Sequence, residues 1–206
     1  MESKVLVLRL YFKNIFNFFY MGKSPAKVIT VYGASSRRID CRFIDAARHL
    51  GELIGRSGYT LVCGGGHTGV MGAAIDGVLS EGGEAVGILP AFMVERKWQH
   101  PGLTRMVSTS TMHERKSRMV EDACSIVACP GGVGTIEELM EIITWRKLGL
   151  WDGHIVILNV DGYYDPLLQM LHKGIEYDFM RSDDAGLWHV AATPEEAVDY
   201  ILHTLK

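Results

Sequence analysis

Short runs of apolar residues alternate with amphipathic segments along the chain from about residue 27 to the C-terminus. The apolar runs predict buried strands at 28–32, 59–63, 84–89, 105–108, 125–129, 154–160 and 188–191. The segments between them predict helices at about 41–57, 69–81, 112–122, 135–148 and 164–178. Thr193 and Pro194 open a last helix as N-cap and first helical residue. Residues 91–104 fit neither pattern and predict a long polar loop, a feature that is often functional.

Strands that alternate with helices predict a mostly parallel sheet with right-handed crossovers and helices on both faces. Strands that are apolar throughout agree with burial on both faces. We therefore predict one doubly wound, Rossmann-like α/β domain over residues 27–206. Residues 1–26 form an N-terminal extension of uncertain order. Its apolar part, Val5 to Tyr20, is too short and too charged to span a membrane, and is either an upstream addition to a protein that starts at Met21 or an amphipathic segment.

Composition excludes several classes of function. The 206 residues include 21 basic and 24 acidic side chains, a net charge of −3, which provides no basic field for nucleic acid. The four cysteines, Cys41, Cys63, Cys124 and Cys129, form no CxxC pair. Three of them lie in or beside apolar runs, so we expect reduced thiols in a cytoplasmic protein rather than a zinc or redox site.

Three glycine-rich turns follow predicted strands, at 33–36, 64–69 and 130–135. Ligands of such sheets bind at the carboxyl ends of the strands, where glycine permits close approach and the next helix presents free N–H groups. The turns therefore predict a phosphate site, with tight helix-on-sheet packing as the alternative. No clean GxGxxG follows the first strand, no acidic residue closes the second, and Walker A is missing, which disfavours nicotinamide dehydrogenases and ATPases.

Two pairs of charged residues accompany these turns. Arg115 and Lys116 lie early in a predicted helix, and Glu137 and Glu138 lie in the first turn after the 130–135 loop. Glu137 could simply complement the helix dipole, and Glu138 could form a capping box with Thr135. A carboxylate beside a phosphate cradle is nevertheless unfavourable unless it has a role in the chemistry.

These residues resemble the motifs of the Lonely Guy family, the cytokinin riboside 5′-monophosphate phosphoribohydrolases formerly described as lysine decarboxylases. The segment from Pro130 to Glu138 resembles its PGGxGTxxE motif, and Met112 to Lys116 resembles MHxRK. The segment from Cys63 to Gly72 is similar to its GGGxxGLMG loop, and the likeness extends over residues 27–180.

The resemblance implies hydrolysis of the N-glycosidic bond of AMP or an N6-modified AMP to free base and ribose 5-phosphate. It implies Arg115 and Glu138 as catalytic residues, with Glu138 stabilising an oxocarbenium-like state and binding ribose hydroxyls or orienting water. It implies no metal or cofactor, and a homodimer with the site near the subunit contact, without nucleic acid or membrane as partner. The implied substrate- and phosphate-binding residues are Ser35, Ser36, Gly64, Gly65, Gly66, Met112, Lys116, Pro130, Gly131, Gly132, Val133, Gly134, Thr135 and Glu137.

Two departures leave base recognition open: His67 stands where a serine is usual, and Lys97 where an acidic residue is common. The alternative function is a non-catalytic protein of the same fold that binds a nucleotide or a pterin cofactor. Amino-acid decarboxylation would need a lysine Schiff base with pyridoxal phosphate, and the only suggestive lysine, Lys116, lies inside the nucleotide motif.

Overall fold

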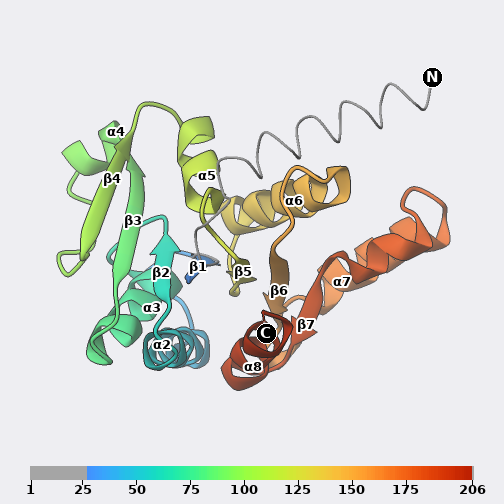
Figure 1. Ribbon diagram of the computed structural model, residues 1–206, viewed down its shortest axis with the longest axis horizontal. Coiled ribbons are helices and arrows are strands. Elements are labelled where there is room, and N and C mark those ends of the chain that lie inside the picture. The colour runs from blue at the N-terminus through green and yellow to red at the C-terminus, as the bar shows by residue number, and fades with distance from the viewer. Residues whose placement is uncertain (1–26, 206) are drawn as a thin grey trace.

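A seven-stranded parallel sheet forms the centre of the protein in a computed structural model that describes residues 27–205 (Figure 1). The strand order is β4-β3-β2-β1-β5-β6-β7, so the order reverses between β1 and β5. The strands are β1 Val28–Tyr32, β2 Thr60–Cys63, β3 Ala85–Pro90, β4 Arg105–Thr109, β5 Ser125–Ala128, β6 His154–Leu158 and β7 His189–Ala191. This sheet confirms the predicted Rossmann-like class, whereas the predicted extension 1–26 lies outside the described residues.

Helices cover both faces of the sheet (Figure 1). They are α2 Cys41–Arg56, α3 Gly69–Ser80, α4 Ala91–Glu95, α5 Met112–Val120, α6 Val133–Leu148, α7 Asp165–Glu176 and α8 Pro194–Thr204, with 3₁₀ turns at Val160–Gly162 and Ser182–Leu187. Helices α2, α3 and α8 pack on one face, and α5 and α6 pack on the other. Because β1 and β5 carry helices to opposite faces, their carboxyl ends diverge into a crevice where a ligand can bind.

The start of α6 differs from the prediction in a way that bears on function. The helix begins at Val133, with Gly132 in an extended conformation as its N-cap. Thr135 is therefore inside the helix, and the capping box between Thr135 and Glu138 is wrong. The Glu138 carboxylate is instead free to contact another element.

The loop predicted over residues 91–104 is more ordered than its polarity suggested. It opens with the short helix α4, and the part that follows pairs with the second glycine turn. The N–H of His67 donates to the carbonyl of Trp98 at 3.1 Å, and the N–H of His100 donates to that of Gly65 at 2.8 Å. These two bonds fasten the loop across the carboxyl end of β2.

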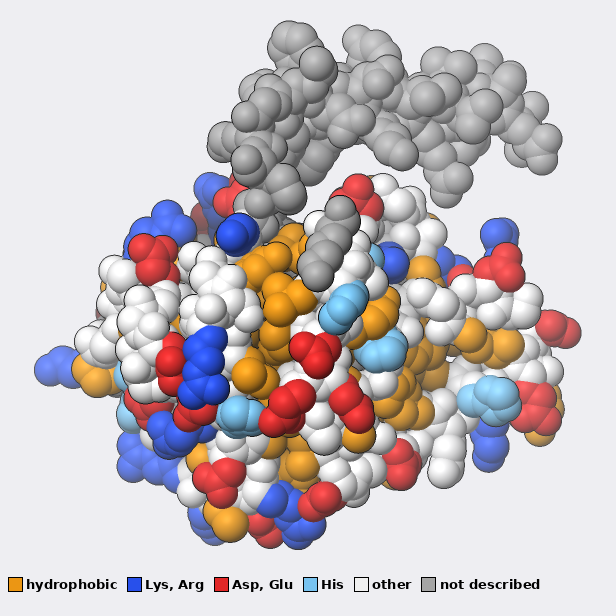
Figure 2. Space-filling model, turned by 60° about the horizontal axis from the view of Figure 1, so that its bottom comes forward, with side chains coloured by type: hydrophobic (Ala, Val, Ile, Leu, Met, Phe, Trp, Pro, Cys, Tyr) orange, Lys and Arg blue, Asp and Glu red, His pale blue; other side chains and the backbone are white. Residues whose placement is uncertain are grey.

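The surface carries charges of both signs. In Figure 2, acidic, basic and apolar side chains are interspersed over the face that is turned forward, without a continuous basic area. Within residues 27–205, no helix combines the length and apolarity that crossing a bilayer requires.

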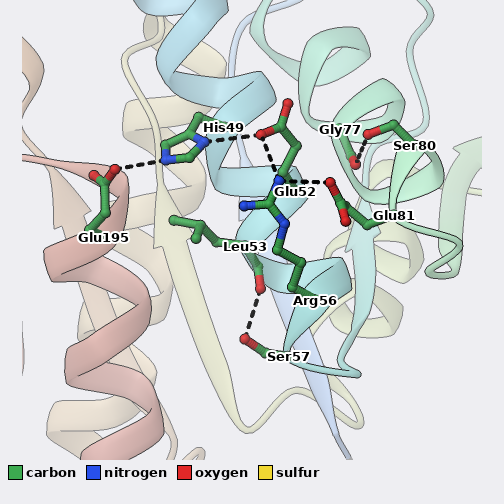
Figure 3. Close-up of polar contacts among 9 residues, drawn as sticks. All are labelled: His49, Glu52, Leu53, Arg56, Ser57, Gly77, Ser80, Glu81 and Glu195. Atoms are coloured by element: carbon green, nitrogen blue, oxygen red, sulfur yellow. Dashed lines mark hydrogen bonds and ion pairs between the residues drawn. The ribbon is translucent and has the colours of Figure 1, made fainter.

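His49 links two helices on one face of the sheet (Figure 3). Its Nδ1 lies 3.1 Å from Glu52 on α2, and its Nε2 lies 2.7 Å from Glu195 on α8. Arg56 contacts Glu52 at 3.6 Å from the other side. The hydrogen bond to Glu52, followed by that to Glu195, raises the pKa of His49 although burial opposes the shift.

We predict a pH-dependent loss of stability in His49→Gln. A histidine whose pKa is raised in the folded state stabilises it fully below about pH 6.5, and that contribution is lost as pH rises through the folded pKa. The melting temperature of the variant should thus fall below that of wild type at pH 6 and approach it at pH 8.5. The free energy of unfolding should fall by less than about 1 kcal/mol, because His49 and its two carboxylate partners are partly exposed. His172→Gln on α7 is the control, and an equal deficit of His49→Gln at both pH values would contradict the assignment.

Candidate active site

A buried ion pair joins α5 to α6 above the carboxyl edge of the sheet. The Nη1 of Arg115 lies 2.9 Å from Oε1 of Glu138, and the two residues are only 7 % and 8 % exposed. The Nε of Arg115 donates to the carbonyl of Ile88 on β3 at 3.2 Å. The structure thus brings together the two residues that the sequence singled out as catalytic, and holds the guanidinium to the sheet as well.

The start of α5, just before Arg115, is fixed by the N-cap Thr111 and by the Glu114 carboxylate. The hydroxyl of Thr111 accepts a hydrogen bond from the N–H of Glu114 at 3.1 Å. The Glu114 carboxylate accepts in turn from the N–H and hydroxyl of Ser110, at 2.8 and 2.7 Å. These bonds between side chains and backbone fix the first helical turn, and Arg115 directly follows it.

Glycine at position 64 makes room for the guanidinium. A Cβ on Gly64 would lie 2.1 Å from Nη2 of Arg115, far inside contact distance. Gly65, the next residue, has a φ of +70°, which favours glycine. The second glycine turn therefore lies directly against Arg115.

The 130–135 turn ends in an open helix terminus. Within the described residues, no side chain caps α6 at Gly132. The first backbone N–H of the helix that donates to a preceding carbonyl is that of Ile136, which donates to Gly132 at 3.0 Å. A Cβ on Gly131 would lie 2.2 Å from Oγ1 of Thr135, so this turn also requires glycine. The amides of residues 133–135 at the positive end of a 16-residue helix form a group suited to an anion.

Two tyrosines that the sequence reasoning did not assign hold this turn from the β6–α7 connection. The hydroxyl of Tyr163 donates to the carbonyl of Gly131 at 2.8 Å, and that of Tyr164 donates to the carbonyl of Cys129 at 2.7 Å. The segment with these tyrosines is part of the family likeness, but their pairing with the turn depends on the fold.

A second group of charged residues, nearer the surface, lies beside the buried pair of Arg115 and Glu138. Burial raises the pKa of Glu138 above its usual range, and the nearby Arg115 opposes the shift. Lys116 contacts Glu137 at 2.5 Å and Glu141 at 3.1 Å, nearer the surface. Burial lowers the pKa of Lys116, but these two hydrogen bonds outweigh it and raise the pKa overall. Lys116 is thus held as an ammonium rather than as a free nucleophilic amine.

Tyr32, the last residue of β1, belongs to the same charged region and was not among the predicted site residues. It is 3 % exposed, and burial raises its pKa well above the usual value, with Glu138 as the next cause. Its position immediately before the first glycine turn was the signal that the sequence offered.

The remaining predicted residues lie at the edges of the site. Met112 and Val133, at the starts of α5 and α6, are 41 % and 85 % exposed. Ser35 and Ser36 are exposed beside α3, where the Ser35 carbonyl accepts from the hydroxyl of Thr68 at 2.6 Å. Ser36 lines an open cavity of about 320 Å³ between α2 and α3 whose lining does not include Arg115 or Glu138.

Comparison with known proteins supports a single family. A family described as "possible lysine decarboxylase" matches residues 71–201. A probable cytokinin riboside 5′-monophosphate phosphoribohydrolase of Oryza sativa subsp. japonica is 36 % identical over 178 residues, covering 86 % of this chain and 72 % of the relative. The phosphoribohydrolase LOG3 of Arabidopsis thaliana is 37 % identical over 179 residues, covering 86 % and 83 %. Among solved structures, a molybdenum cofactor binding protein of Rippkaea orientalis has a TM-score of 0.69 at 22 % identity, covering 90 % of this chain and 99 % of that one, which shows the shared fold.

The buried pair makes a prediction about stability. Arg115→Met should lower the free energy of unfolding by about 3–5 kcal/mol at pH 7, because it leaves the Glu138 carboxylate buried without its partner. The pKa of Glu138 should rise further, so the variant should be relatively more stable at pH 5 and lose stability as pH rises. Adding Glu138→Gln to Arg115→Met should restore part of the loss.

Denaturant unfolding of the single and double variants measures this coupling. Arg118→Met removes an exposed pair with Glu121 on the same helix and should change stability by less than about 1 kcal/mol. Additive effects of the Arg115 and Glu138 substitutions would show that the pair is not coupled.

Proposed function

Since the chain belongs to the family described as possible lysine decarboxylases, which includes the Lonely Guy phosphoribohydrolases, we propose that it hydrolyses purine nucleoside 5′-monophosphates. The products are the free base and ribose 5-phosphate, and the substrates are AMP or an N6-modified AMP. The observation that carries the proposal is the buried contact of Arg115 with Glu138 at 2.9 Å beside the uncapped start of α6.

The phosphate binds first in this scheme. The amides of 133–135 receive it, and the dipole of α6 adds favourable potential. Lys116 lies close by as an auxiliary positive charge, already shared with Glu137 and Glu141. Binding energy from this non-reacting group holds the ribose against the catalytic pair, which lowers the barrier.

Glu138 then acts on the sugar. As the C1′–N9 bond breaks, positive charge develops on the ribose, and the ionised carboxylate stabilises it. A water oriented by Glu138 adds its oxygen to C1′, and its proton passes through the carboxylate toward the departing base. Arg115 opposes the rise that burial causes in the pKa of Glu138, which favours the ionised form, and fixes the direction of the carboxylate.

The two alternatives have less support. The molybdenum cofactor binding protein is 22 % identical, and a likeness at that level shows the fold alone. A decarboxylase would need a lysine amine free to form a Schiff base, whereas Lys116 is engaged by two carboxylates. All four cysteines are free thiols, which agrees with the cytoplasmic compartment that we propose for the reaction.

We predict that Glu138→Gln abolishes release of adenine from AMP, with a loss of at least about a thousandfold in kcat, while AMP still binds. The measurement is chromatographic detection of free base, together with calorimetric binding of AMP. Glu176→Gln is the control, because its carboxylate is exposed on α7 and is not among the implied site residues. Turnover near the wild-type rate in Glu138→Gln would remove Glu138 from catalysis. No base release by wild type across AMP, IMP and an N6-prenylated AMP would reject the enzyme.

We also propose a homodimer whose contact lies beside the site. Two exposed apolar side chains, Met112 and Val133, occupy the first positions of the two helices that carry Arg115 and Glu138. A second copy would cover them and exclude water from the reaction. Light scattering after size exclusion should give twice the chain mass at assay concentrations, and full activity of a monomer would contradict this.

A further inference from the structure

The amide of Gln99 is a buried polar group that the scheme above does not use. Gln99 lies in the loop after α4, and its Oε1 is buried without a hydrogen-bond partner. The buried oxygen is an acceptor, as assigned in the structure, and no donor in the described part of the chain pairs with it. Buried amide oxygens are normally paired, and an exception suggests a missing ligand.

Backbone pairing determines which way this side chain points. Gln99 and Gly66 form an antiparallel bridge, flanked by the bonds from His67 to Trp98 and from His100 to Gly65. These flanking bonds make Gln99 and Gly66 a non-hydrogen-bonded pair, whose side chains lie on the same side and close together. Since Gly66 has no side chain, no side chain of the paired residue covers Gln99 at this position.

The Met71 side chain lies between that side of the bridge and Arg115. A Cβ on Gly66 would lie 3.4 Å from Sδ of Met71 and 3.6 Å from Cβ of Ser35. A Cβ on Gly64 would lie 3.3 Å from Cε of the same Met71 and 2.1 Å from Nη2 of Arg115. The Met71 side chain therefore separates the space beside Gln99 from the Arg115 guanidinium.

A primary amide offers an acceptor and a donor side by side, the arrangement that pairs with the N6–H and N7 of adenine. We propose that Gln99 recognises the N6 edge of the adenine base, in the substrate assigned under the proposed function on which this inference rests. An N6-alkylated adenine keeps one N6–H and is compatible with the same contact. A base without an N6 donor leaves the buried Oε1 unpaired.

The test compares AMP with purine riboside 5′-monophosphate, which lacks the amino group. The readout is the ratio of kcat/KM for the two nucleotides, in wild type and in Gln99→Met. The difference in leaving-group chemistry between the bases cancels in this comparison. We expect Gln99→Met to reduce the preference for AMP by about tenfold or more, mainly through KM.

Glu95→Gln, in the same α4 region but exposed, is the control and should keep the wild-type ratio. Gln99→Ala serves as a second variant if Gln99→Met is unstable. An unchanged ratio in a folded Gln99 variant overturns the inference. If wild type releases no base at all, the proposed function fails by itself. In that case the role of Gln99 is tested by calorimetry, through the ratio of the affinities for the two nucleotides in wild type and in Gln99→Met.

Discussion

The contact between Arg115 and Glu138 is the constraint around which this end of the molecule is built. Two charges with under a tenth of their surface exposed lose hydration that their mutual attraction only partly replaces. The pair is tolerated because the surroundings complete it: the Ile88 carbonyl accepts from Nε, and Gly64 leaves room for Nη2. A buried ion pair of this kind is weak evidence for stability and stronger evidence for a use.

The topology separates anion binding from carboxylate chemistry. Both depend on α6, but the free amides lie in its first turn while Glu138 lies one turn later, directed at α5. Tyr163 and Tyr164 fix the preceding turn through backbone carbonyls, so the anion site does not need a side-chain cap. In the proposed reaction, the phosphate would therefore meet backbone amides while the carboxylate faces Arg115.

Local signals were sufficient for the strands and the glycine turns. Apolar runs such as 28–32 are bounded by glycine or by polar residues, and the observed β1 has the same limits. The start of α6 could not be read this way, because Thr135 looks like an N-cap while the extended Gly132 performs that role. Tyr32 and Gln99 escaped notice because their importance depends on contacts between distant segments.

The first departure from the family pattern, His67, is explained by its contacts with Arg37 and Trp98. An arginine can only donate, so the 3.2 Å contact from Nη2 of Arg37 makes Nε2 of His67 an acceptor. The proton must then be on Nδ1, which donates to the carbonyl of Trp98 at 2.9 Å. Both ring nitrogens are thus engaged in fastening the loop, and His67 has no polar atom left for a base. These contacts therefore hold the polar loop beside the site and leave His67 no polar atom for a base, whereas Oε1 of Gln99 in the same loop has no partner in the described residues.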